Sequence, residues 1–287
     1  MLVSMKYLLD KAKDAVFAVG AFNATELALV RSVVEQAEES DSPAIIEASA
    51  GEFEFVTKDF YKYVIERCKD SRVPFALHLD HGHTVEECVR AIQAGFTSVM
   101  IDGSTLPYEE NVALTKKVVE IAHAAGVTVE GEIGTIGAIG NSDEGGVTNI
   151  TYTRPEDVVD FVEKTGVDCL AIAIGTAHGI YPKGYTPKLQ LELLEEIKKI
   201  APVPLVLHGG SNNPDDEIAK ACKIGIAKVN ISSDIKYAYF KKLDEVYRET
   251  GGFVPAKVMG PAIVDTKAVV KNKMELFNSV GKASLYR

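Results

Sequence analysis

The sequence predicts an α/β protein with a single (β/α)₈ barrel. Eight short apolar runs, bounded by glycine and proline, alternate with longer segments of helical periodicity. Continuous apolar runs of this kind are typical of parallel strands that are covered on both faces. Eight strand–helix units suffice to close one barrel. No linker, low-complexity tract or charge block divides the chain, so residues 1–287 are expected to form one domain.

The elements can be assigned in order along the chain. Residues 4–13 predict a helix that covers the bottom of the barrel, and residues 256–280 predict an added C-terminal helix. Segments between the strands carry one apolar face, as the spacing of apolar residues in 84–95 and 189–200 shows. The strands are expected at residues 16–23, 43–49, 74–80, 98–104, 128–134, 169–175, 204–210 and 228–233.

Composition and charge exclude several classes of protein. Hydrophobic residues make up 46% of the chain and charged residues 25%, which is ordinary globular usage and argues against disorder and collagen-like repeats. The net charge is -10, from 31 Lys and Arg against 41 Asp and Glu. An acidic surface repels phosphate backbones and anionic lipids, so nucleic acid and membranes are not expected partners.

The four cysteines are scattered along the chain and form no CxxC pair. This pattern predicts buried, reduced thiols in a cytoplasmic protein. The first residues lack the apolar core of a signal peptide, and no apolar run approaches the roughly 18 residues of a membrane span. The cysteines are Cys68, Cys88, Cys169 and Cys222.

Polar residues end nearly every predicted strand, which is where barrel enzymes carry their chemistry. Histidines end the third, sixth and seventh strands, and three imidazoles with one open position form the ligand set of a catalytic zinc. A hydrogen-bonded rim histidine is the alternative for each of them taken singly, and His83 is the substitute ligand if one is wrong. The strand-end residues are Asn23, Ser49, Asp80, His81, Asp102, Glu132, His178, His208 and Asn230.

Three carboxylates accompany these histidines. Asp80 directly precedes His81, where it can act as a general acid or base on a metal-bound substrate. Its alternative role is to hold His81 in one tautomer. Glu132 and Asp102 end neighbouring strands, and they are candidates for alternate or second-site metal ligands, or for charge balance.

Two loops predict a phosphate site. The segment HGGSNNPDDEI (208–218) is a glycine turn that opens a helix, and NISSDIK (230–236) ends the eighth strand and opens the next helix. The loops after strands seven and eight form the recurrent phosphate cradle of this fold, in which backbone N–H groups bind the anion. Plain helix caps are the alternative.

Six longer motifs run through the chain in a fixed order. They are HLDHGH (78–83), MIDGS (100–104), EGEIGTIG (130–137), AIAIGTAHGIY (171–181), LVLHGGS (205–211) and KVNISSD (228–234). Together they resemble the class II, zinc-dependent ketose-bisphosphate aldolases, a family that includes fructose-1,6-bisphosphate and tagatose-1,6-bisphosphate aldolases. The resemblance extends from GAFN (20–23) to MELFNSVGKA (274–283).

The resemblance implies a lyase with a (β/α)₈ barrel that reversibly cleaves a ketose bisphosphate to dihydroxyacetone phosphate and an aldehyde through an enediolate. By position it makes His81, His178 and His208 the zinc ligands and Asp80 the proton donor, with Glu132 and Asp102 at an auxiliary metal site. It also implies a monovalent cation, Na⁺ or K⁺, and a dimer or tetramer. The implied substrate contacts are Asn23, Ser49, Gly179, Gly209, Gly210, Ser211, Asn230, Ile231, Ser232 and Ser233.

The chain departs from the family pattern at several positions. The usual Gly-Gly-x-Glu-Asp stretch is GAIGNSDEGG (137–146) here, so Asp143 and Glu144, the candidates for moving the C1 proton, come several residues late. The common HGGSG is HGGSN, and Ser233 replaces a threonine. An arginine often linked to the distal phosphate is Lys257 or is absent, and lysine lacks the bidentate fork of arginine.

Other functions share parts of this pattern. A Schiff-base aldolase needs a lysine at a strand end, and Lys228 begins the eighth predicted strand instead. A metal-dependent hydrolase could use the same zinc and acid on water. An aldolase for another ketose phosphate and a non-catalytic sugar-phosphate-binding paralogue complete the alternatives.

Overall fold

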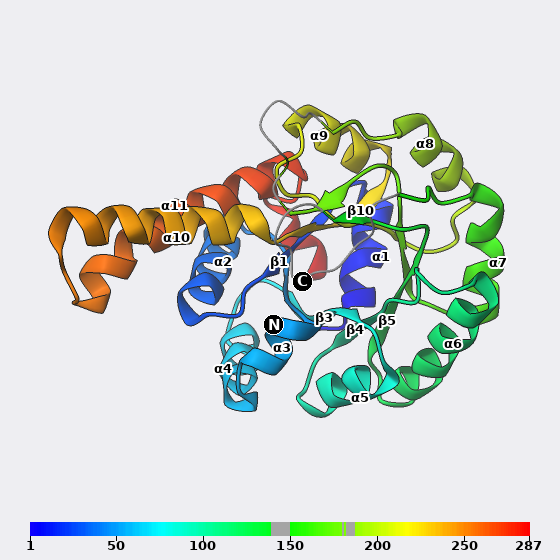
Figure 1. Ribbon diagram of the computed structural model, residues 1–287, viewed down its shortest axis with the longest axis horizontal. Helices are drawn as coiled ribbons and strands as arrows, with labels where there is room; N and C mark the ends of the chain where they lie inside the picture. The colour runs from blue at the N-terminus through cyan, green and yellow to red at the C-terminus, as the bar shows by residue number, and fades with distance from the viewer. Residues whose placement is uncertain (139–149, 180, 182–186) are drawn as a thin grey trace.

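A computed structural model describes residues 1–138, 150–179, 181 and 187–287. Its centre is a closed barrel of eight parallel strands in the order β1-β10-β9-β7-β5-β4-β3-β2, which confirms the predicted fold (Figure 1). Each of the eight predicted runs overlaps one barrel strand, although β3 ends two residues later and β10 begins two residues earlier than expected. The strands are β1 (Val19–Asn23), β2 (Ala44–Ser49), β3 (Phe75–Gly82), β4 (Ser98–Ile101), β5 (Thr128–Ile133), β7 (Cys169–Ile172), β9 (Leu205–Leu207) and β10 (Ile226–Ile231).

Helices surround the barrel, and two short strands, β6 (Gly137–Ala138) and β8 (Ala177–His178), pair with each other above it. Local sequence signals set several helix ends; the start of α5, for example, is a capping box between Thr84 and Glu87. The helices are α1 (Met5–Ala15), α2 (Leu27–Glu39), α3 (Ala50–Phe55), α4 (Lys58–Lys69), α5 (Val85–Gln93), α6 (Tyr108–Ala124), α7 (Pro155–Thr165), α8 (Leu191–Ile200), α9 (Asp215–Ile224), α10 (Ser233–Thr250), α11 (Pro255–Leu276) and the 3₁₀ helix η1 (Lys282–Tyr286).

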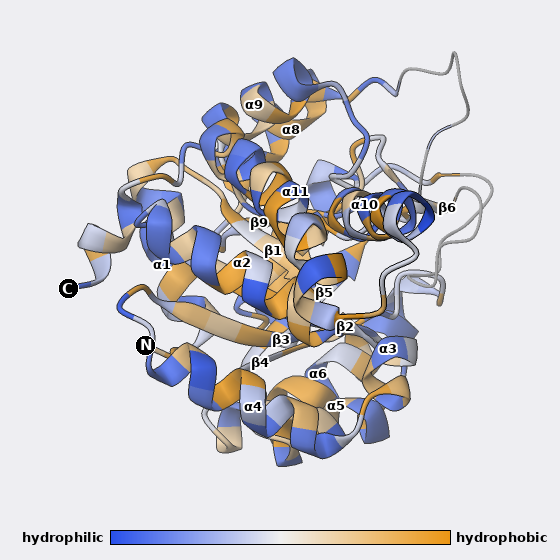
Figure 2. Cartoon of the chain, turned by 90° about the vertical axis from the view of Figure 1, so that its left-hand side faces the viewer, coloured by the Kyte–Doolittle hydropathy of each residue, from blue (hydrophilic) through white to orange (hydrophobic). Residues whose placement is uncertain are grey.

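The hydrophobic core has two parts. The larger part lies between the sheet and the surrounding helices, whose outward faces are hydrophilic (Figure 2). The smaller part fills the bottom of the barrel, where Met5, Leu8 and Leu9 of α1 pack against inward residues such as Val19 and Ile45. The predicted N-terminal helix therefore plugs the barrel bottom, as expected.

Polar residues form a layer above this apolar plug. Glu47, His78, Glu130 and Lys228 have no exposed surface. Lys228 is the third residue of β10, because the strand begins at Ile226 and a register shift follows that residue. The expectation that Lys228 begins the eighth strand was therefore wrong, and its side chain lies inside the barrel.

The added C-terminal helix predicted at 256–280 is α11. It runs antiparallel to α10, and the two helices form a hairpin that projects from the barrel (Figure 1). Lys257 lies in the first turn of α11, and α11 begins at the tip of this hairpin (Figure 1). Among the described residues, no helix is both long enough and apolar enough to span a membrane.

Candidate active site

The site is built around an irregularity in β3. In a regular strand the side chains of Asp80 and His81 would point to opposite faces. Here the pairing of β3 with β4 shifts register between Leu79 and Gly82, and His81 has a left-handed φ of 49°. This bulge directs both side chains into the barrel mouth, where each is buried. Backbone strain of this kind clusters at functional sites.

The three predicted histidines meet in the mouth. One ligand nitrogen from each of His81, His178 and His208 lies within 4.8 Å of the other two. His81 Nε2 is 2.9 Å from His208 Nδ1, and all three side chains are buried. The expected position of His178 was the end of a barrel strand, but it lies on the short strand β8, outside the barrel sheet. Three converging imidazoles fit the requirement of a divalent zinc-like cation.

Asp102 and Glu132 lie on the other side of His81. Asp102 Oδ2 is 2.9 Å from His81 Nδ1, and the three residues also form a group that could hold a metal. Burial and the nearby Asp102 raise the pKa of Glu132 well above its usual value, and its Oε2 atom is buried without a hydrogen-bond partner. Burial lowers the pKa of His81, but Asp80 and Asp102 together outweigh burial and raise it to about 10. Both shifts show that carboxylates crowd this side of the site, an arrangement that favours the binding of a cation.

Asp80 is held by two amides. Its carboxylate accepts hydrogen bonds of 2.9 Å from Asn23 Nδ2 and from Asn230 Nδ2. Burial opposes its ionisation, but the nearby His81, His208 and Lys228, with the hydrogen bond from Asn23, lower the pKa of Asp80 below its ordinary value. The Oδ1 atoms of both asparagines are buried without hydrogen-bond partners. A fixed, ionised carboxylate flanked by two such acceptors is suited to bind hydroxyl groups and take a proton from one of them.

The two predicted phosphate loops are joined by hydrogen bonds. The backbone N–H of Gly210 donates to the carbonyl of Asn230 at 3.0 Å, and Ser211 Oγ accepts from the N–H of Ser232 at 3.2 Å. Asp234 accepts from the N–H of Asn212 and pairs with the buried Lys273 of α11 at 2.8 Å. The start of α10 and the glycine turn are thereby held side by side, as an amide cradle for phosphate requires.

Comparisons with known proteins give the same assignment. Residues 3–282 match the family described as "Fructose-bisphosphate aldolase class-II". The chain belongs to this family. It is 41% identical over 290 residues to a fructose-bisphosphate aldolase of Geobacillus stearothermophilus, with 99% of both chains covered. A fructose-bisphosphate aldolase of Staphylococcus aureus is 42% identical over 288 residues, covering 98% of this chain and 99% of that one.

Solved structures agree with this membership. The YdjI aldolase of Escherichia coli K12 superposes with a TM-score of 0.87 at 32% identity and covers 99% of this chain and 100% of its own. The fructose-bisphosphate aldolase of Campylobacter jejuni gives a TM-score of 0.82 at 25% identity, with 98% and 97% covered. The protein is therefore a class II aldolase, which is a lyase.

The remaining predicted site residues of the aldolase, together with the substitute ligand His83, fall into four groups. Ser49, the last residue of β2, and Gly179, which follows His178, lie at the mouth. Ile231 packs its side chain into the core outside the barrel, so only its backbone can face a substrate. Asp143 and Glu144 lie outside the described residues. His83 is exposed beyond the end of β3, and the described contacts place it in none of the metal groups.

The sequence reading missed the polar layer inside the aldolase barrel. Glu130 contacts the ligand candidate His208 at 2.7 Å and Lys228 at 3.0 Å, yet neither Glu130 nor Lys228 was a predicted site residue. The alternation of side chains along a strand could have revealed this layer, because residues two positions apart point to the same face. Glu47, His78, Glu130 and Lys228 each stand two positions before a predicted mouth residue, namely Ser49, Asp80, Glu132 and Asn230.

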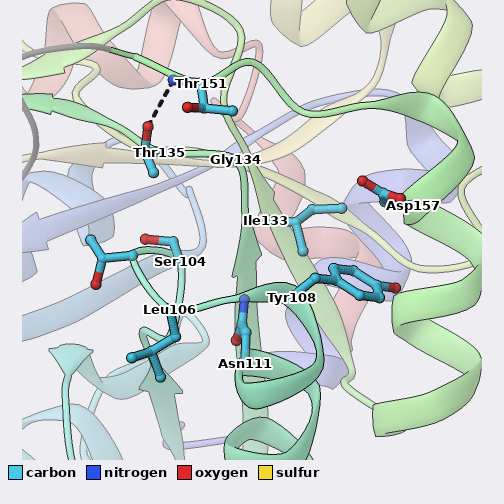
Figure 3. Close-up of a pocket in the computed structure, with 10 residues that line it drawn as sticks. Ser104, Leu106, Tyr108, Asn111, Ile133, Gly134, Thr135, Thr151 and Asp157 are labelled. Atoms are coloured by element: carbon cyan, nitrogen blue, oxygen red, sulfur yellow. Dashed lines mark hydrogen bonds between the residues drawn. The ribbon is translucent and has the colours of Figure 1, made fainter.

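A cavity of about 370 Å³ opens beside the mouth of the aldolase, between the loop after β4 and the end of β5 (Figure 3). Thr151 N–H donates to Thr135 Oγ1 at 2.8 Å across its rim. Its described lining residues do not include the three histidines or Asp80, so we assign it no part in the reaction.

Gly209 offers a first test of the predicted phosphate loop of the aldolase. Its φ is +62°, and a Cβ atom there would lie 2.7 Å from the backbone carbonyl oxygen of Ala177, next to His178. We expect Gly209→Ala to lower the free energy of unfolding and to raise KM for dihydroxyacetone phosphate. Gly251 is the matched control, because its φ is +58° and a Cβ there meets nothing within 4 Å.

Gly251→Ala should cost only the left-handed conformation, about 1–2 kcal/mol, with KM unchanged. Urea unfolding and steady-state kinetics measure both quantities. Equal costs for the two variants, with equal KM, would show that the approach of Gly209 to Ala177 is unimportant.

Proposed function

We propose that the protein is a zinc-dependent aldolase that reversibly cleaves fructose 1,6-bisphosphate to dihydroxyacetone phosphate and glyceraldehyde 3-phosphate. The convergence of His81, His178 and His208 beside the amide-held Asp80 is the observation that carries this proposal. The related fructose-bisphosphate aldolases named above support the choice of substrate. Tagatose 1,6-bisphosphate or another ketose phosphate is the alternative substrate.

The three histidines would hold the zinc, with Asp102 and Glu132 in reach of a second or alternate position. When bound, zinc supplies Lewis-acid chemistry: it polarises ketose oxygens and stabilises the negative charge that develops on cleavage. The neutral imidazole needed in a ligand is consistent with His208, because burial and the nearby His81 hold its pKa well below the usual value.

The chain's own residues perform the proton transfers and position the substrate. Asp80 takes the proton of the C4 hydroxyl in cleavage and returns it in synthesis. Asn23 and Asn230 fix the Asp80 carboxylate, and their free carbonyl oxygens accept substrate hydroxyls. Asp143 or Glu144 is proposed to deliver a proton, after cleavage, to the hydroxymethyl carbon (C1) of dihydroxyacetone phosphate, and to remove that proton in synthesis.

Binding of the phosphate falls to the two loops after β9 and β10. Backbone N–H groups at the start of α10 and in the glycine turn bind it without arginine. The net charge of -10 is then no obstacle to a small anionic substrate, because the field of these nearby dipoles acts at short range. The implied contacts in this cradle are Gly179, Gly209, Gly210, Ser211, Ile231, Ser232 and Ser233.

The Schiff-base alternative is disfavoured by the surroundings of Lys228. Burial opposes its charge, but Glu130 and Glu47 together raise the pKa of Lys228 above its ordinary value. A protonated amine locked between two carboxylates is a poor nucleophile. Borohydride reduction in the presence of substrate should therefore leave no covalent adduct on the protein.

Metal removal tests the proposed function. We expect chelation to abolish cleavage and stoichiometric Zn²⁺ to restore it, because the Lewis acid is lost and regained. The assay follows triose phosphate and inorganic phosphate released from a panel of ketose phosphates. Full activity in a verified metal-free sample would exclude zinc catalysis, release of inorganic phosphate would indicate a hydrolase, and no turnover at all would favour a sugar-phosphate-binding protein.

We further propose the following setting for the enzyme. It acts in the cytoplasm, in carbohydrate breakdown of the glycolytic type, as one domain over residues 1–287. A monovalent cation, Na⁺ or K⁺, binds near the phosphate. The enzyme forms a homo-oligomer, a dimer or tetramer, and the projecting hairpin of α10 and α11 provides a surface for it. Light scattering measures the oligomeric state.

A further inference from the structure

The buried polar layer of the barrel lies directly beneath the proposed metal position, and no step of the proposed reaction uses it. Glu130 and Lys228 are completely buried, as is Glu47, whose Oε2 atom is 3.6 Å from Lys228 Nζ. Removing charges from water costs several kcal/mol each unless they are compensated by partners. Such a layer persists in a barrel interior only if its members are paired and oriented.

Glu130 joins this layer to the mouth. Its Oε1 atom is 2.7 Å from His208 Nε2, and its Oε2 atom is 3.0 Å from Lys228 Nζ. An ionised carboxylate can only accept hydrogen bonds, so His208 Nε2 must carry the proton. In a neutral imidazole the other nitrogen, Nδ1, then has a free lone pair. That nitrogen is the one that faces His81 Nε2 at 2.9 Å.

His81 shows the opposite arrangement. Asp102 Oδ2 lies 2.9 Å from its Nδ1 atom, which leaves Nε2 facing His208. Asp102 and Glu130 therefore hold different ring nitrogens of the two histidines, Nδ1 of His81 and Nε2 of His208. The remaining nitrogens, His81 Nε2 and His208 Nδ1, face each other at 2.9 Å, where a bound metal would take the place of the proton between them. Histidine ligands of metal sites are commonly oriented by carboxylates in this way, and loss of such a partner weakens metal binding by about 10–100-fold.

We propose that Glu130 is a positioning residue for the metal site: it fixes His208 in the tautomer that presents Nδ1, and Lys228 fixes the Glu130 carboxylate from below. This inference rests on the proposed zinc site. The alternative is that Glu130 only balances the charge of Lys228. The matched residue Glu47 distinguishes these roles, because it also pairs with Lys228, whereas the 2.7 Å contact with His208 Nε2 is made by Glu130.

The experiment compares Glu130→Gln with the matched control Glu47→Gln. Zinc affinity of each purified full-length protein is measured by competition with a chromophoric chelator. We expect the dissociation constant to rise by about 10–100-fold in Glu130→Gln and to stay within about threefold of the original in Glu47→Gln. With Co²⁺ in place of zinc, the visible d–d spectrum should change in Glu130→Gln only.

Unchanged zinc affinity in Glu130→Gln, or an equal loss in both variants, would overturn the proposal. If Glu130→Gln does not fold, Glu130→Asp takes its place. This variant keeps a negative charge for Lys228 but draws the carboxylate back by one methylene, so it must show the same loss of affinity. The unsubstituted protein distinguishes failure of the proposed function from failure of this inference. If it binds no zinc, the proposed function fails. If it binds zinc and the variants bind zinc equally well, only the role of Glu130 is contradicted.

Discussion

Replacement of Asp80 by alanine is expected to lower kcat for cleavage by about 10²–10⁴-fold while the zinc content is retained. The carboxylate is the proposed acceptor of the C4 hydroxyl proton, and a loss of this size is typical when a positioned acid–base group is removed. Its Oδ1 atom lies 3.8 Å from His81 Nε2 and 3.9 Å from His208 Nδ1, so it is near the ligand atoms without hydrogen bonding to them. Steady-state kinetics and metal analysis of the same sample measure both quantities.

A partial reaction supplies the control for this variant. Exchange of the C1 proton of dihydroxyacetone phosphate with solvent involves no C4 hydroxyl, so Asp80→Ala should retain it. Loss of exchange together with cleavage would indicate a damaged metal site, and unchanged cleavage would remove Asp80 from the mechanism. Asn23→Ala should have a smaller effect on kcat than Asp80→Ala, because the Asn230 amide would still hold the carboxylate.

The barrel and most of its mouth could be predicted because both follow from strong local patterns. Buried parallel strands must be apolar, and their carboxyl ends share one face, so the strand-end residues Asp80, Asp102 and Glu132 had to be neighbours. Glu130 and Lys228 lie two residues before mouth residues on the same strands, so they point to the same side. However, a charged residue within an apolar run is easily taken for the end of the strand. The shifted start of β10 concealed Lys228 in this way.

Other features of the site depend on tertiary structure. Nothing in the letters Asp80-His81 indicates a bulge with a left-handed histidine, because that conformation is tolerated only where the surrounding contacts impose it. His178 reaches the mouth from β8, whose two residues pair only with β6, and strands this short carry no periodicity. The hydrogen bond between Glu130 and His208 joins residues 78 positions apart, which no local pattern encodes.

Lys228→Met is expected to produce the largest loss of stability. The substitution keeps an unbranched side chain that is one atom shorter, but it leaves the Glu130 and Glu47 carboxylates without their cation inside the barrel. Breaking a buried ion pair from one side costs about 3–5 kcal/mol. Urea unfolding, monitored by tyrosine fluorescence or circular dichroism, gives the free energy of unfolding. Lys220→Met is the control, because the Lys220–Asp216 pair is exposed and should contribute less than about 1 kcal/mol.

A second substitution tests whether the loss comes from uncompensated charge. Lys228→Met combined with Glu47→Gln removes one carboxylate together with the cation, while Glu130 keeps its hydrogen bond to His208. The double variant should therefore be more stable than Lys228→Met alone, with a coupling energy of about 0.5–3 kcal/mol. Additive losses would mean that Lys228 stabilises the barrel mainly by filling space. In that case the charge of Lys228 would contribute little to fixing Glu130 beneath the metal site.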